Sequence, residues 1–446
     1  MADTVYWTNY EYNDYSIRGA PLSGGGTVDT LYTSTQGVNI ALGLAIDAAA
    51  GRIYWTNYGD NKILRAPLAG GGTVDTLYGP GDGVSDPFGL AIDPAAGRIY
   101  WTNGEWDQGA GGTIRRAPLA GGGTVDTLYT SAQGVVGPSG LTIDPAAGFL
   151  YWGNSAGATI CRAPLSGGGA VDTLYGATQG VAGPYGLAID RAAGRLYWTN
   201  YTDSSIRGAP LAGGGSVDTL YGWNQAVRSP GGVAIDPDGT GPVTIDLGIR
   251  DTSRFAVGDW IGKAIGWARD IVSRPPPPKG LMYWTNRVSA GWQGYPPSAS
   301  DNTIRRAPLG SGGQIDNLYA SAQGVLLPDA IALLRSPVAA GAPTISWSLI
   351  LDDGIFGGWQ FGGGQSGPLG QSLTCSRGSW APDLLGSHLY RAPQSFEYQW
   401  RLNGTDIGGA NQRNYATTGP GSYTCRVTAT NRAGSAAQMS AAVTIS

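Results

Sequence analysis

Few residues of this sequence have side chains that suit acid–base, nucleophilic or metal chemistry. Its 446 residues include one histidine, His388, and three cysteines. His388 lies near the C-terminus, far along the chain from the repeated segments described below, so we expect neither a histidine-based triad nor a histidine-bearing metal site among those segments. Glu105 and Asp107 are carboxylates in a single loop, and such a pair is more typical of a solvated rim than of a general acid and its base.

Clusters of glycine suggest a second kind of chemistry, the binding of phosphate. Gly70, Gly71 and Gly72 form one such cluster, and similar clusters recur along the chain. A phosphate-binding loop needs a strand before it and the N-terminus of a helix after it, and no helical pattern follows these glycines. We interpret them as tight turns. The sequence therefore predicts no catalytic residue, no metal and no cofactor.

Aromatic residues are abundant and set the fold class. The chain contains 15 Trp, 23 Tyr and 74 Gly against only 6 Phe and 3 Met, a composition typical of many short strands joined by tight turns, so an all-β fold is expected. The net charge is −4 and Lys and Arg form no runs, which argues against a nucleic-acid partner. No apolar run approaches the ~20 residues of a transmembrane helix, so no membrane insertion is expected.

A sixfold repeat positions the aromatic residues. The stretch Tyr-Trp-Thr-Asn begins at Tyr6, Tyr54, Tyr100, Tyr151, Tyr197 and Tyr283, with a glycine replacing the threonine in the fourth copy. A Gly-Leu-Ala-Ile-Asp block such as 89–93 precedes it, and two apolar blocks such as 114–119 and 125–129 follow it. Each block has the length of a strand, and turn residues separate the blocks. Each period therefore predicts a four-stranded propeller blade with strands a to d.

The two ends of the repeat region indicate how the ring closes. The chain begins in a b strand at Tyr6, and one extra a-like block, 330–334, follows the sixth d strand. That block supplies the missing inner strand of the first blade. We therefore predict a six-bladed β-propeller over residues 1–335, closed by its last strand.

The repeat resembles the YWTD-repeat six-bladed propeller of the low-density lipoprotein receptor family. The resemblance rests on the pairing of Gly-Leu-Ala-Ile-Asp with Tyr-Trp-Thr-Asn at blade spacing. The last motif position is asparagine in every copy, where the family has an aspartate that helps to pin neighbouring blades. The resemblance implies a structural role for these asparagines, and it does not extend to a charge-dependent calcium or pH role. The asparagines are Asn9, Asn57, Asn103, Asn154, Asn200 and Asn286.

One face of the predicted disc differs from blade to blade. Because strand direction alternates, the b-to-c and d-to-a loops share this variable face, whereas the nearly identical a-to-b and c-to-d loops share the repetitive face. The variable loops mix aromatic rings with carboxylates and amides, which suits the binding of a protein or a glycan. For any single ring, packing between blades remains an equal alternative. The candidate ligand-binding residues are Tyr10, Tyr12, Tyr58, Trp106, Asp107, Tyr185, Tyr201, Trp223, Trp292 and Tyr295.

An insertion interrupts the sixth blade. Residues 239–279 are extra residues in its a-to-b turn, and within them 259–273 has apolar residues at helical spacing before the proline run 275–278. This pattern predicts a short helix. We expect its apolar stripe to dock on the protein itself, on the repetitive face, where it could brace the tail.

The last hundred residues predict a second domain. After a linker at 336–342, the order and spacing of Cys375, Trp400, Tyr423 and Cys425 within 343–446 resemble bacterial immunoglobulin-like modules. The resemblance implies a β-sandwich with a disulfide between Cys375 and Cys425. The third cysteine, Cys161, falls in a c strand and is expected to be a buried small residue.

These observations favour a non-enzymatic ligand-binding or adhesion protein, located outside the cell or on the surface of a particle. An alternative is a structural component of a phage virion or a phage-tail-like particle. A disulfide suggests an oxidising setting, yet residues 1–5 run directly into the first repeat and no secretory signal is expected; particle proteins are made in the cytosol and exposed after release. A third hypothesis is a propeller hydrolase or lyase, which clustered pKa shifts at the channel mouth would support.

Overall fold

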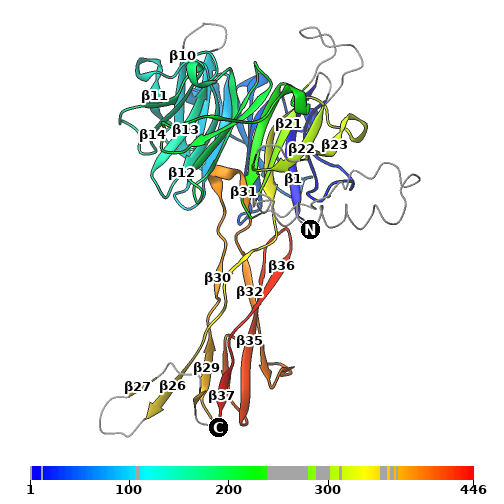
Figure 1. The fold of residues 1–446 in the computed structure, drawn as a ribbon, viewed down its shortest axis with the longest axis vertical. Helices are drawn as coiled ribbons and strands as arrows, with labels where there is room; N and C mark the ends of the chain where they lie inside the picture. Colours follow the sequence, from blue (N-terminus) through cyan, green and yellow to red (C-terminus); the bar gives the residue numbers. More distant parts are fainter. Residues whose placement is uncertain are drawn as a thin grey trace, which may run out of the picture.

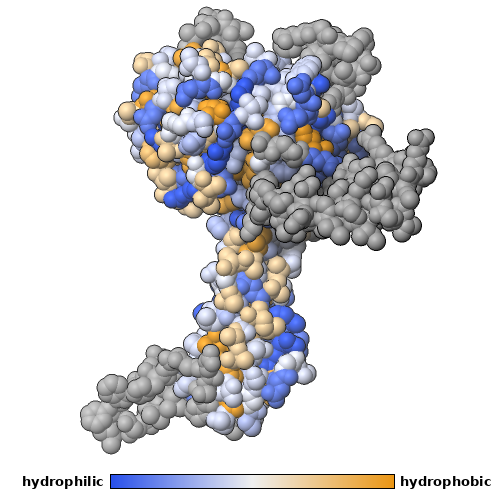
Figure 2. Space-filling model, viewed as in Figure 1, coloured by the Kyte–Doolittle hydropathy of each residue, from blue (hydrophilic) through white to orange (hydrophobic). Residues whose placement is uncertain are grey.

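The chain forms a wide β-propeller head above a narrow C-terminal stalk. The computed structural model describes residues 3–11, 14–105, 111–238, 280–287, 302–310, 314–351, 359–361, 366–367 and 370–446. Figure 1 shows the head at one end of the long axis and the C-terminus at the other, and the space-filling view in Figure 2 shows the narrow waist between them. No helix in these ranges is long and apolar enough to span a membrane. The predicted helix at 259–273 lies outside the described residues.

Six sheets of four antiparallel repeat strands build the head, as the sequence predicts. The first contains β24(Pro328–Leu334), β1(Thr4–Glu11), β2(Asp14–Pro21) and β3(Asp29–Thr33). The second contains β4(Ala41–Asp47), β5(Arg52–Asn57), β6(Lys62–Pro67) and β7(Asp75–Tyr78). The third contains β8(Pro87–Asp93), β9(Arg98–Glu105), β10(Gly111–Pro118) and β11(Asp126–Thr130). The fourth contains β12(Pro138–Asp144), β13(Phe149–Asn154), β14(Thr159–Pro164) and β15(Asp172–Tyr175).

The remaining two sheets follow the same order. The fifth contains β16(Pro184–Asp190), β17(Arg195–Asn200), β18(Ser205–Pro210) and β19(Asp218–Tyr221). The sixth contains β20(Pro230–Asp236), β21(Leu281–Asn286), β22(Thr303–Pro308) and β23(Asp316–Ala320). Short 3-10 turns lie in the variable-face loops: η1(Ser34–Gln36), η2(Tyr58–Asp60), η3(Pro80–Asp82), η4(Ser131–Gln133), η5(Ala177–Gln179), η6(Trp223–Gln225) and η7(Ser321–Gln323).

The ring closes through β24, as predicted. The innermost strand of each blade contacts that of the next, and β24 contacts both β20 and β4. It also pairs antiparallel with β1, with Ala332 opposite Tyr6 and Leu334 opposite Thr4. The N-terminal b strand and the last a strand thus share one blade.

The Tyr-Trp-Thr-Asn motif holds the blades together. Each motif tryptophan is fully buried and stacks on the d-strand tyrosine of the preceding blade, with ring centroids 5.6–6.0 Å apart. Its Nε1–H donates to the motif asparagine over 2.9–3.1 Å. The asparagine Nδ2 in turn donates to a carbonyl of the preceding d-to-a loop over 2.6–2.9 Å. The asparagines are therefore structural, and their amide both accepts and donates.

The motif threonine links adjacent inner strands, and the fourth blade compensates for its loss. Thr56 Oγ1 accepts from Gly43 N–H and donates to Phe88 O of the next blade, both over 2.7 Å. Gly153 replaces this threonine in the fourth blade. There the hydroxyl of Ser139 lies 2.6 Å from Pro184 O of the next blade and 3.1 Å from Gly153 O.

The C-terminal domain consists of two main sheets and a two-stranded neck. One sheet contains β26(Ile345–Leu351), β27(Trp359–Phe361), β29(Ser372–Cys375) and β34(Asn414–Ala416). The other contains β28(Ser366–Gly367), β32(Ser395–Leu402), β33(Thr405–Asp406), β35(Gly421–Thr430), β36(Ser435–Met439) and β37(Val443–Ile445). In the neck, β25(Ala339–Gly341) pairs with β30(Ser379–Trp380).

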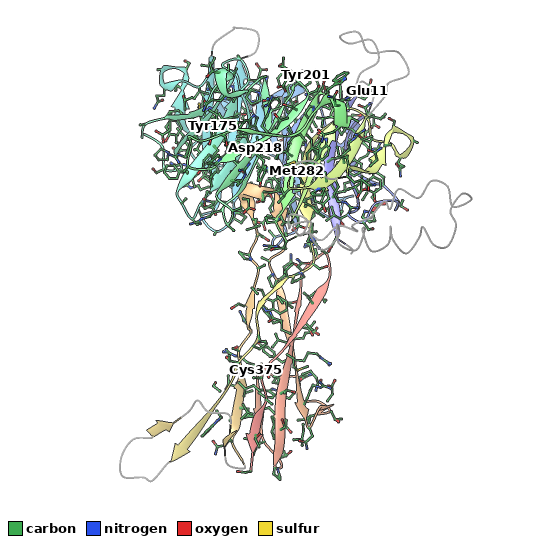
Figure 3. All side chains as sticks on the ribbon, viewed as in Figure 1. Glu11, Tyr175, Tyr201, Asp218, Met282 and Cys375 are labelled. Atoms are coloured by element: carbon green, nitrogen blue, oxygen red, sulfur yellow. The ribbon has the colours of Figure 1, made fainter. Side chains whose placement is uncertain are left out.

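The core of this domain contains the residues that carried the sequence resemblance. Trp400, Tyr423, Cys375 and Cys425 are fully buried and pack in one cluster, and Tyr423 Oη donates to Gly419 O over 2.7 Å. Both cysteines are free thiols, so the predicted disulfide is not formed in this structure. The neighbouring Cys425 thiol raises the pKa of Cys375, and the Cys375 thiol lowers the pKa of Cys425. Figure 3 shows Cys375 inside the stalk.

A loop of the C-terminal domain enters the propeller from the repetitive face. It contains η8(Leu385–Ser387) and β31(Leu389–Tyr390), and β31 pairs parallel with β24. We call residues 384–390 the plug. Although His388 is far along the chain from the repeats, its Nε2 is 2.9 Å from Leu187 O of the fifth inner strand. A contact between segments some two hundred residues apart leaves no periodic signal in the sequence.

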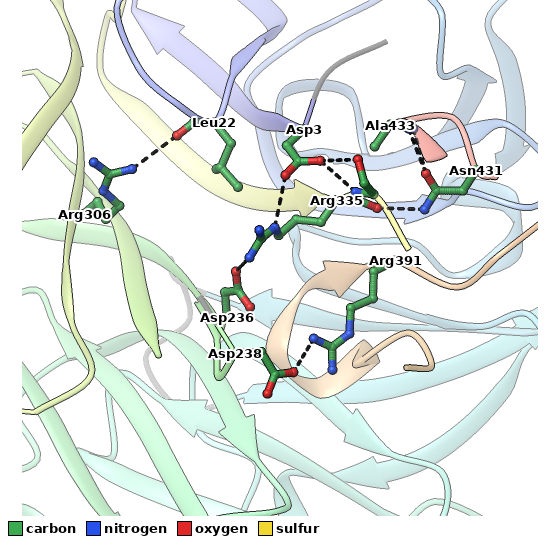
Figure 4. A network of polar contacts seen from close by, with 11 residues as sticks. Asp3, Leu22, Asp236, Asp238, Arg306, Arg335, Arg391, Asn431 and Ala433 are labelled. Atoms are coloured by element: carbon green, nitrogen blue, oxygen red, sulfur yellow. Dashed lines mark hydrogen bonds and ion pairs between the residues drawn. The ribbon is translucent and has the colours of Figure 1, made fainter. Parts of the chain in front are cut away.

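Ion pairs around the plug tie the stalk to the head (Figure 4). Arg335, directly after the closing strand, pairs with Asp3 and Asp236. Arg391, directly after the plug, pairs with Asp238. Both arginines thus join residues of the tail to the rim of the propeller.

Candidate functional site

Two positions of the repeat surround the central channel on the variable face. One is the second residue of each inner strand, and the other is the residue after the motif asparagine. Their neighbours in the repeat are nearly constant, but these two positions vary. The first set is Leu42, Phe88, Ser139, Tyr185, Gly231 and Asp329. The second set is Tyr10, Tyr58, Gly104, Ser155, Tyr201 and Arg287.

Five of these residues meet as a central cluster: Arg287, Asp329, Tyr185, Tyr10 and Tyr201. The Arg287 Nη1 donates to Asp329 Oδ2 over 3.0 Å and to Tyr185 Oη over 2.7 Å. Tyr185 Oη donates to the same carboxylate oxygen over 2.7 Å. The guanidinium carbon lies 4.1, 4.8 and 5.6 Å from the ring centroids of Tyr185, Tyr201 and Tyr10. A single cation therefore orients three aromatic rings.

Burial controls the charges of the central cluster. The side chains of Arg287 and Asp329 are 6% and 1% exposed. Loss of hydration raises the pKa of Asp329 to about 6, although the nearby Arg287 opposes this shift. Burial also raises the pKa of Tyr185 well above its usual value, so Tyr185 is a neutral hydrogen-bond donor at pH 7. Among the described residues, Asp329 Oδ1 and Arg287 Nε have no hydrogen-bond partner.

An axial cavity lies between the central cluster and the plug. Its volume is about 40 Å³, and residues of all six inner strands line it, with Asp329 and Tyr185 at the variable end and His388 at the plug. Burial lowers the pKa of His388. Pockets for organic ligands usually measure ~300 Å³ or more, whereas a single water needs only ~10–15 Å³. The cavity thus has room for water but not for an organic substrate.

The structure brings together three of the residues singled out from the sequence. Tyr10, Tyr185 and Tyr201 surround Arg287, as described above. Tyr58 is partly exposed at the start of η2, and its N–H donates to Ile40 O over 3.0 Å. Trp223 is 50% exposed at the rim. The other candidates, Tyr12, Trp106, Asp107, Trp292 and Tyr295, lie outside the described residues.

Sequence reasoning missed the two charged members of the cluster. Arg287 occupies the same repeat position as Tyr10 and Tyr201, and Asp329 occupies the same position as Tyr185. Comparing the six repeats position by position would have found both, because each is a charged residue where the other blades have none. Searching for exposed aromatic residues alone overlooked them.

Comparisons with known proteins agree with this fold. No protein-family model and no curated protein matches the sequence. Among solved structures, the nidogen/laminin complex matches with a TM-score of 0.50 and 20% identity over 74% of this chain and 97% of that chain. Virginiamycin B lyase from Staphylococcus aureus matches at 0.42 and 17% over 72% and 83%, respectively. A luciferin-regenerating enzyme matches at 0.48 and 12% over 73% and 91%.

The similarity is one of fold. The match to nidogen supports the YWTD-type β-propeller inferred from the repeat. The chain is a β-propeller followed by a second, C-terminal β domain.

Proposed function

We propose that this protein is a non-enzymatic binding protein whose variable propeller face contacts a protein or glycan partner. The observation that carries the proposal is the opposite placement of the two faces. The plug enters the repetitive face and the narrow stalk leaves from it, whereas the residues that depart from the repeat lie on the opposite face. Glu11 and Tyr201 mark that end in Figure 3.

The central cluster suits recognition because it is rigid before a partner arrives. The contacts of Arg287 fix the rings of Tyr10 and Tyr201, which are both partly exposed. Rings that are already ordered lose little conformational entropy on binding. The similar nidogen structure is a complex with a protein, laminin, which makes a protein partner the first to test.

The stalk fits the role of a spacer in this proposal. Its immunoglobulin-like character, expected from the sequence, agrees with the buried Trp400 and the hydrogen bond from Tyr423 to Gly419. A head held by a plug on a narrow stalk would present its variable face to the surroundings. We propose that this display takes place outside the cell or on the surface of a particle.

A binding screen of the full chain tests the proposal. The full chain is needed because truncation at residue 335 would remove the plug. The unsubstituted chain and the variants Tyr10→Ser and Tyr201→Ser would each be screened on glycan arrays and against surface proteins from the source. Both variants install the residue that the fourth blade has at this repeat position, Ser155. The control is Met439→Ser on the stalk, where Met439 is 37% exposed. Binding lost only in the tyrosine variants, with unchanged melting temperatures, supports the proposal.

Two other results would redirect it. Binding retained by both tyrosine variants would remove the central cluster from the interface. Absence of any ligand, together with copurification of the full chain with a large particle, would favour the structural role in a virion or tail-like assembly instead.

A catalytic role is the second candidate, and one observation favours it. Asp329, whose pKa is raised to about 6, sits with Arg287 and Tyr185 at the channel mouth, and such clustered shifts are typical of active sites. Hydrolase or lyase activity would require Asp329 to reach a substrate. Since Asp329 is 1% exposed and the adjoining cavity has a volume of about 40 Å³, binding is the better supported function. Lactone hydrolysis or elimination that is abolished by Asp329→Asn would reverse this ranking.

A further inference from the structure

One variable-face loop departs from the other five in two residues that contact each other. Trp223 opens the 3-10 turn η6, and Arg228 lies five residues further, just before β20. In the other d-to-a loops, the position of Trp223 is occupied by Ser34, Pro80, Ser131, Ala177 and Ser321. The position of Arg228 is occupied by Asn39, Ser85, Val136, Ala182 and Leu326. Small or uncharged residues thus suffice for the fold, so the structure of the blade does not require a tryptophan and an arginine here.

Contacts within the loop hold the pair rigid. The guanidinium carbon of Arg228 lies 3.8 Å from the centroid of the Trp223 ring. Arg228 Nη1 donates to Trp223 O over 2.7 Å and to Val227 O over 2.9 Å. Trp223 nevertheless remains 50% exposed, and it is one of only two exposed large apolar side chains in the described part of the chain.

Within the described residues, Arg228 has no carboxylate partner, in contrast to several other cations of this face. Arg18 pairs with Asp14, Arg207 with Asp203, and Lys62 with Asp60. Within the described residues, Arg228 bonds only through Nη1, so its Nε and Nη2 edge is open. That edge has the fork geometry that binds a carboxylate through two parallel hydrogen bonds.

We propose that the Trp223–Arg228 pair binds an acidic sugar residue, a uronate within a polysaccharide. This inference rests on the proposed binding function and names one ligand class for it. The indole offers a flat surface on which the apolar face of a pyranose ring stacks. Arg228 stacks on the opposite face of the indole, so its open edge meets the carboxylate of a neighbouring uronate of the same polymer.

Neighbouring amides favour a glycan over an acidic peptide. Asn224 and Gln225 are exposed between the two members of the pair. Gln225 uses its Oε1 to accept from Gly222 N–H over 3.1 Å, which leaves its amide N–H groups for ligand hydroxyls. A flat, exposed ring bordered by amides matches a sugar, whereas protein hot spots are usually enclosed by a rim that excludes water.

The test compares an acidic polymer with its neutral counterpart. Polygalacturonate and its fully methyl-esterified form would be titrated calorimetrically into the full chain. We expect the ester to bind about tenfold more weakly because it cannot form the charged fork, and we expect added salt to weaken only the acidic polymer. Trp223→Ser and Arg228→Asn, which install the residues of the first loop, should each reduce polygalacturonate affinity by about tenfold or more.

Two controls isolate the pair. Lys62→Asn removes a cation of the same face that already has a partner, so it should leave the affinity unchanged. The second control starts from the chain that carries both Trp223→Ser and Arg228→Asn. Adding Ala177→Trp and Ala182→Arg to this chain rebuilds the pair in the preceding d-to-a loop and should restore binding. If this graft did not restore binding, a tryptophan–arginine pair in a d-to-a loop would not be sufficient to bind polygalacturonate.

Other outcomes separate this inference from the proposed function. Equal binding of both polymers, no binding of either, or full affinity in Trp223→Ser and Arg228→Asn overturns the uronate site. The proposed function would still stand if a different partner were lost in Tyr10→Ser and Tyr201→Ser. A protein partner lost in the Trp223 and Arg228 variants would place binding at this pair but would overturn its assignment to a sugar.

Discussion

At the scale of single residues, the motif asparagine explains how this chain departs from the YWTD pattern. Asn57 accepts from Trp55 Nε1 over 2.9 Å and donates from Nδ2 to Gly37 O over 2.6 Å. An ionised aspartate accepts but cannot donate. The Gly37 carbonyl needs a donor, which an asparagine amide supplies and an aspartate does not. The same arrangement recurs in all six blades.

The change Asn57→Asp should destabilise the propeller by about 2 kcal/mol, because a buried carboxylate would face the Gly37 carbonyl without a donor. The measurement is chemical unfolding followed by tryptophan fluorescence. The loss should shrink as pH falls from 7 towards ~4, because burial raises the folded pKa of the introduced aspartate above its unfolded value of ~3.9 and the protonated acid regains a donor. Equal destabilisation at pH 7 and pH 4 would show that the donated hydrogen bond is not the cause.

Asp329 gives the second prediction at this scale. Its pKa is raised to about 6 when folded and is ~3.9 when unfolded, so the folded protein binds this proton more tightly. Stability from this group therefore rises as pH falls from above 6 towards 4. Relative to Asp329→Asn, the unsubstituted chain should gain on the order of 2 kcal/mol between pH 7 and pH 4. Thermal melts of both proteins across this range provide the measurement, and parallel pH profiles would contradict the shift.

At the scale of elements, the plug fits closely against segments that are distant in the sequence. Gly386 lies against the fourth and fifth inner strands, and Thr142 Oγ1 donates to its carbonyl over 3.0 Å. A Cβ added at Gly386 would lie 2.3 Å from Ile189 Cγ1 and 2.8 Å from Ile143 O. Only a residue without a side chain fits here.

Gly386→Ala should therefore unseat the plug and lower the melting temperature by several degrees, since a contact of this kind costs about 1–3 kcal/mol. Gly408→Ala is the matched control because a Cβ there meets nothing within 4 Å. Limited proteolysis should cut the Gly386→Ala chain within 384–390 and leave the control intact. If neither chain were cut within 384–390, the channel would accommodate the extra methyl group by a small shift of its residues, and the prediction would be wrong.

The elements that sequence could predict are those governed by periodicity. The blades and the closure by β24 follow from short apolar blocks at constant spacing, since each strand is determined by its own alternation and by turns on either side. The plug was unpredictable because its partners Leu187, Ile189 and Thr142 are ordinary members of the repeat. The central cluster was half predictable: Tyr10, Tyr185 and Tyr201 stood out as aromatic residues. The pairing of Arg287 with Asp329 depends on the end of β21 and the start of β24, which only the closed ring brings together.

At the scale of the whole molecule, the axis of the propeller runs from the variable face to the plug that attaches the stalk. Asp329 and His388 line the same axial cavity, one at the variable face and one in the plug. Asp329 and His388 are both linked to the closing strand β24. Asp329 is part of β24, and the N–H of Leu333 in the same strand donates to His388 O over 2.9 Å. The closing strand thus connects the candidate binding site with the attachment of the stalk.

Acid should loosen the attachment of the stalk through His388. Burial lowers its pKa, so its contribution to the docked state is complete above pH ~6.5, the unfolded value, and is lost as pH falls below it. In the described part of the chain, the other charged or titratable groups near the plug include Asp329 and Tyr185 in the cavity. On the tail side they include Asp383, Tyr390, the Arg391–Asp238 pair, and Asp47, which acts on Asp383 and Tyr390. Asp329 acts in the opposite direction, because its protonation below pH ~6 stabilises the folded head.

Hydrogen exchange separates the two effects. Exchange of residues 384–391 would be measured from pH 7.5 to pH 5 in the unsubstituted chain and in His388→Gln, whose amide can donate to Leu187 O but does not titrate. Protection of this segment should decrease in the unsubstituted chain relative to the variant at each acidic pH. Protection of β35 in the stalk should be equal in both, which excludes global unfolding. If the two chains lose protection of the plug in parallel, the docking of head and stalk does not depend on the protonation of His388.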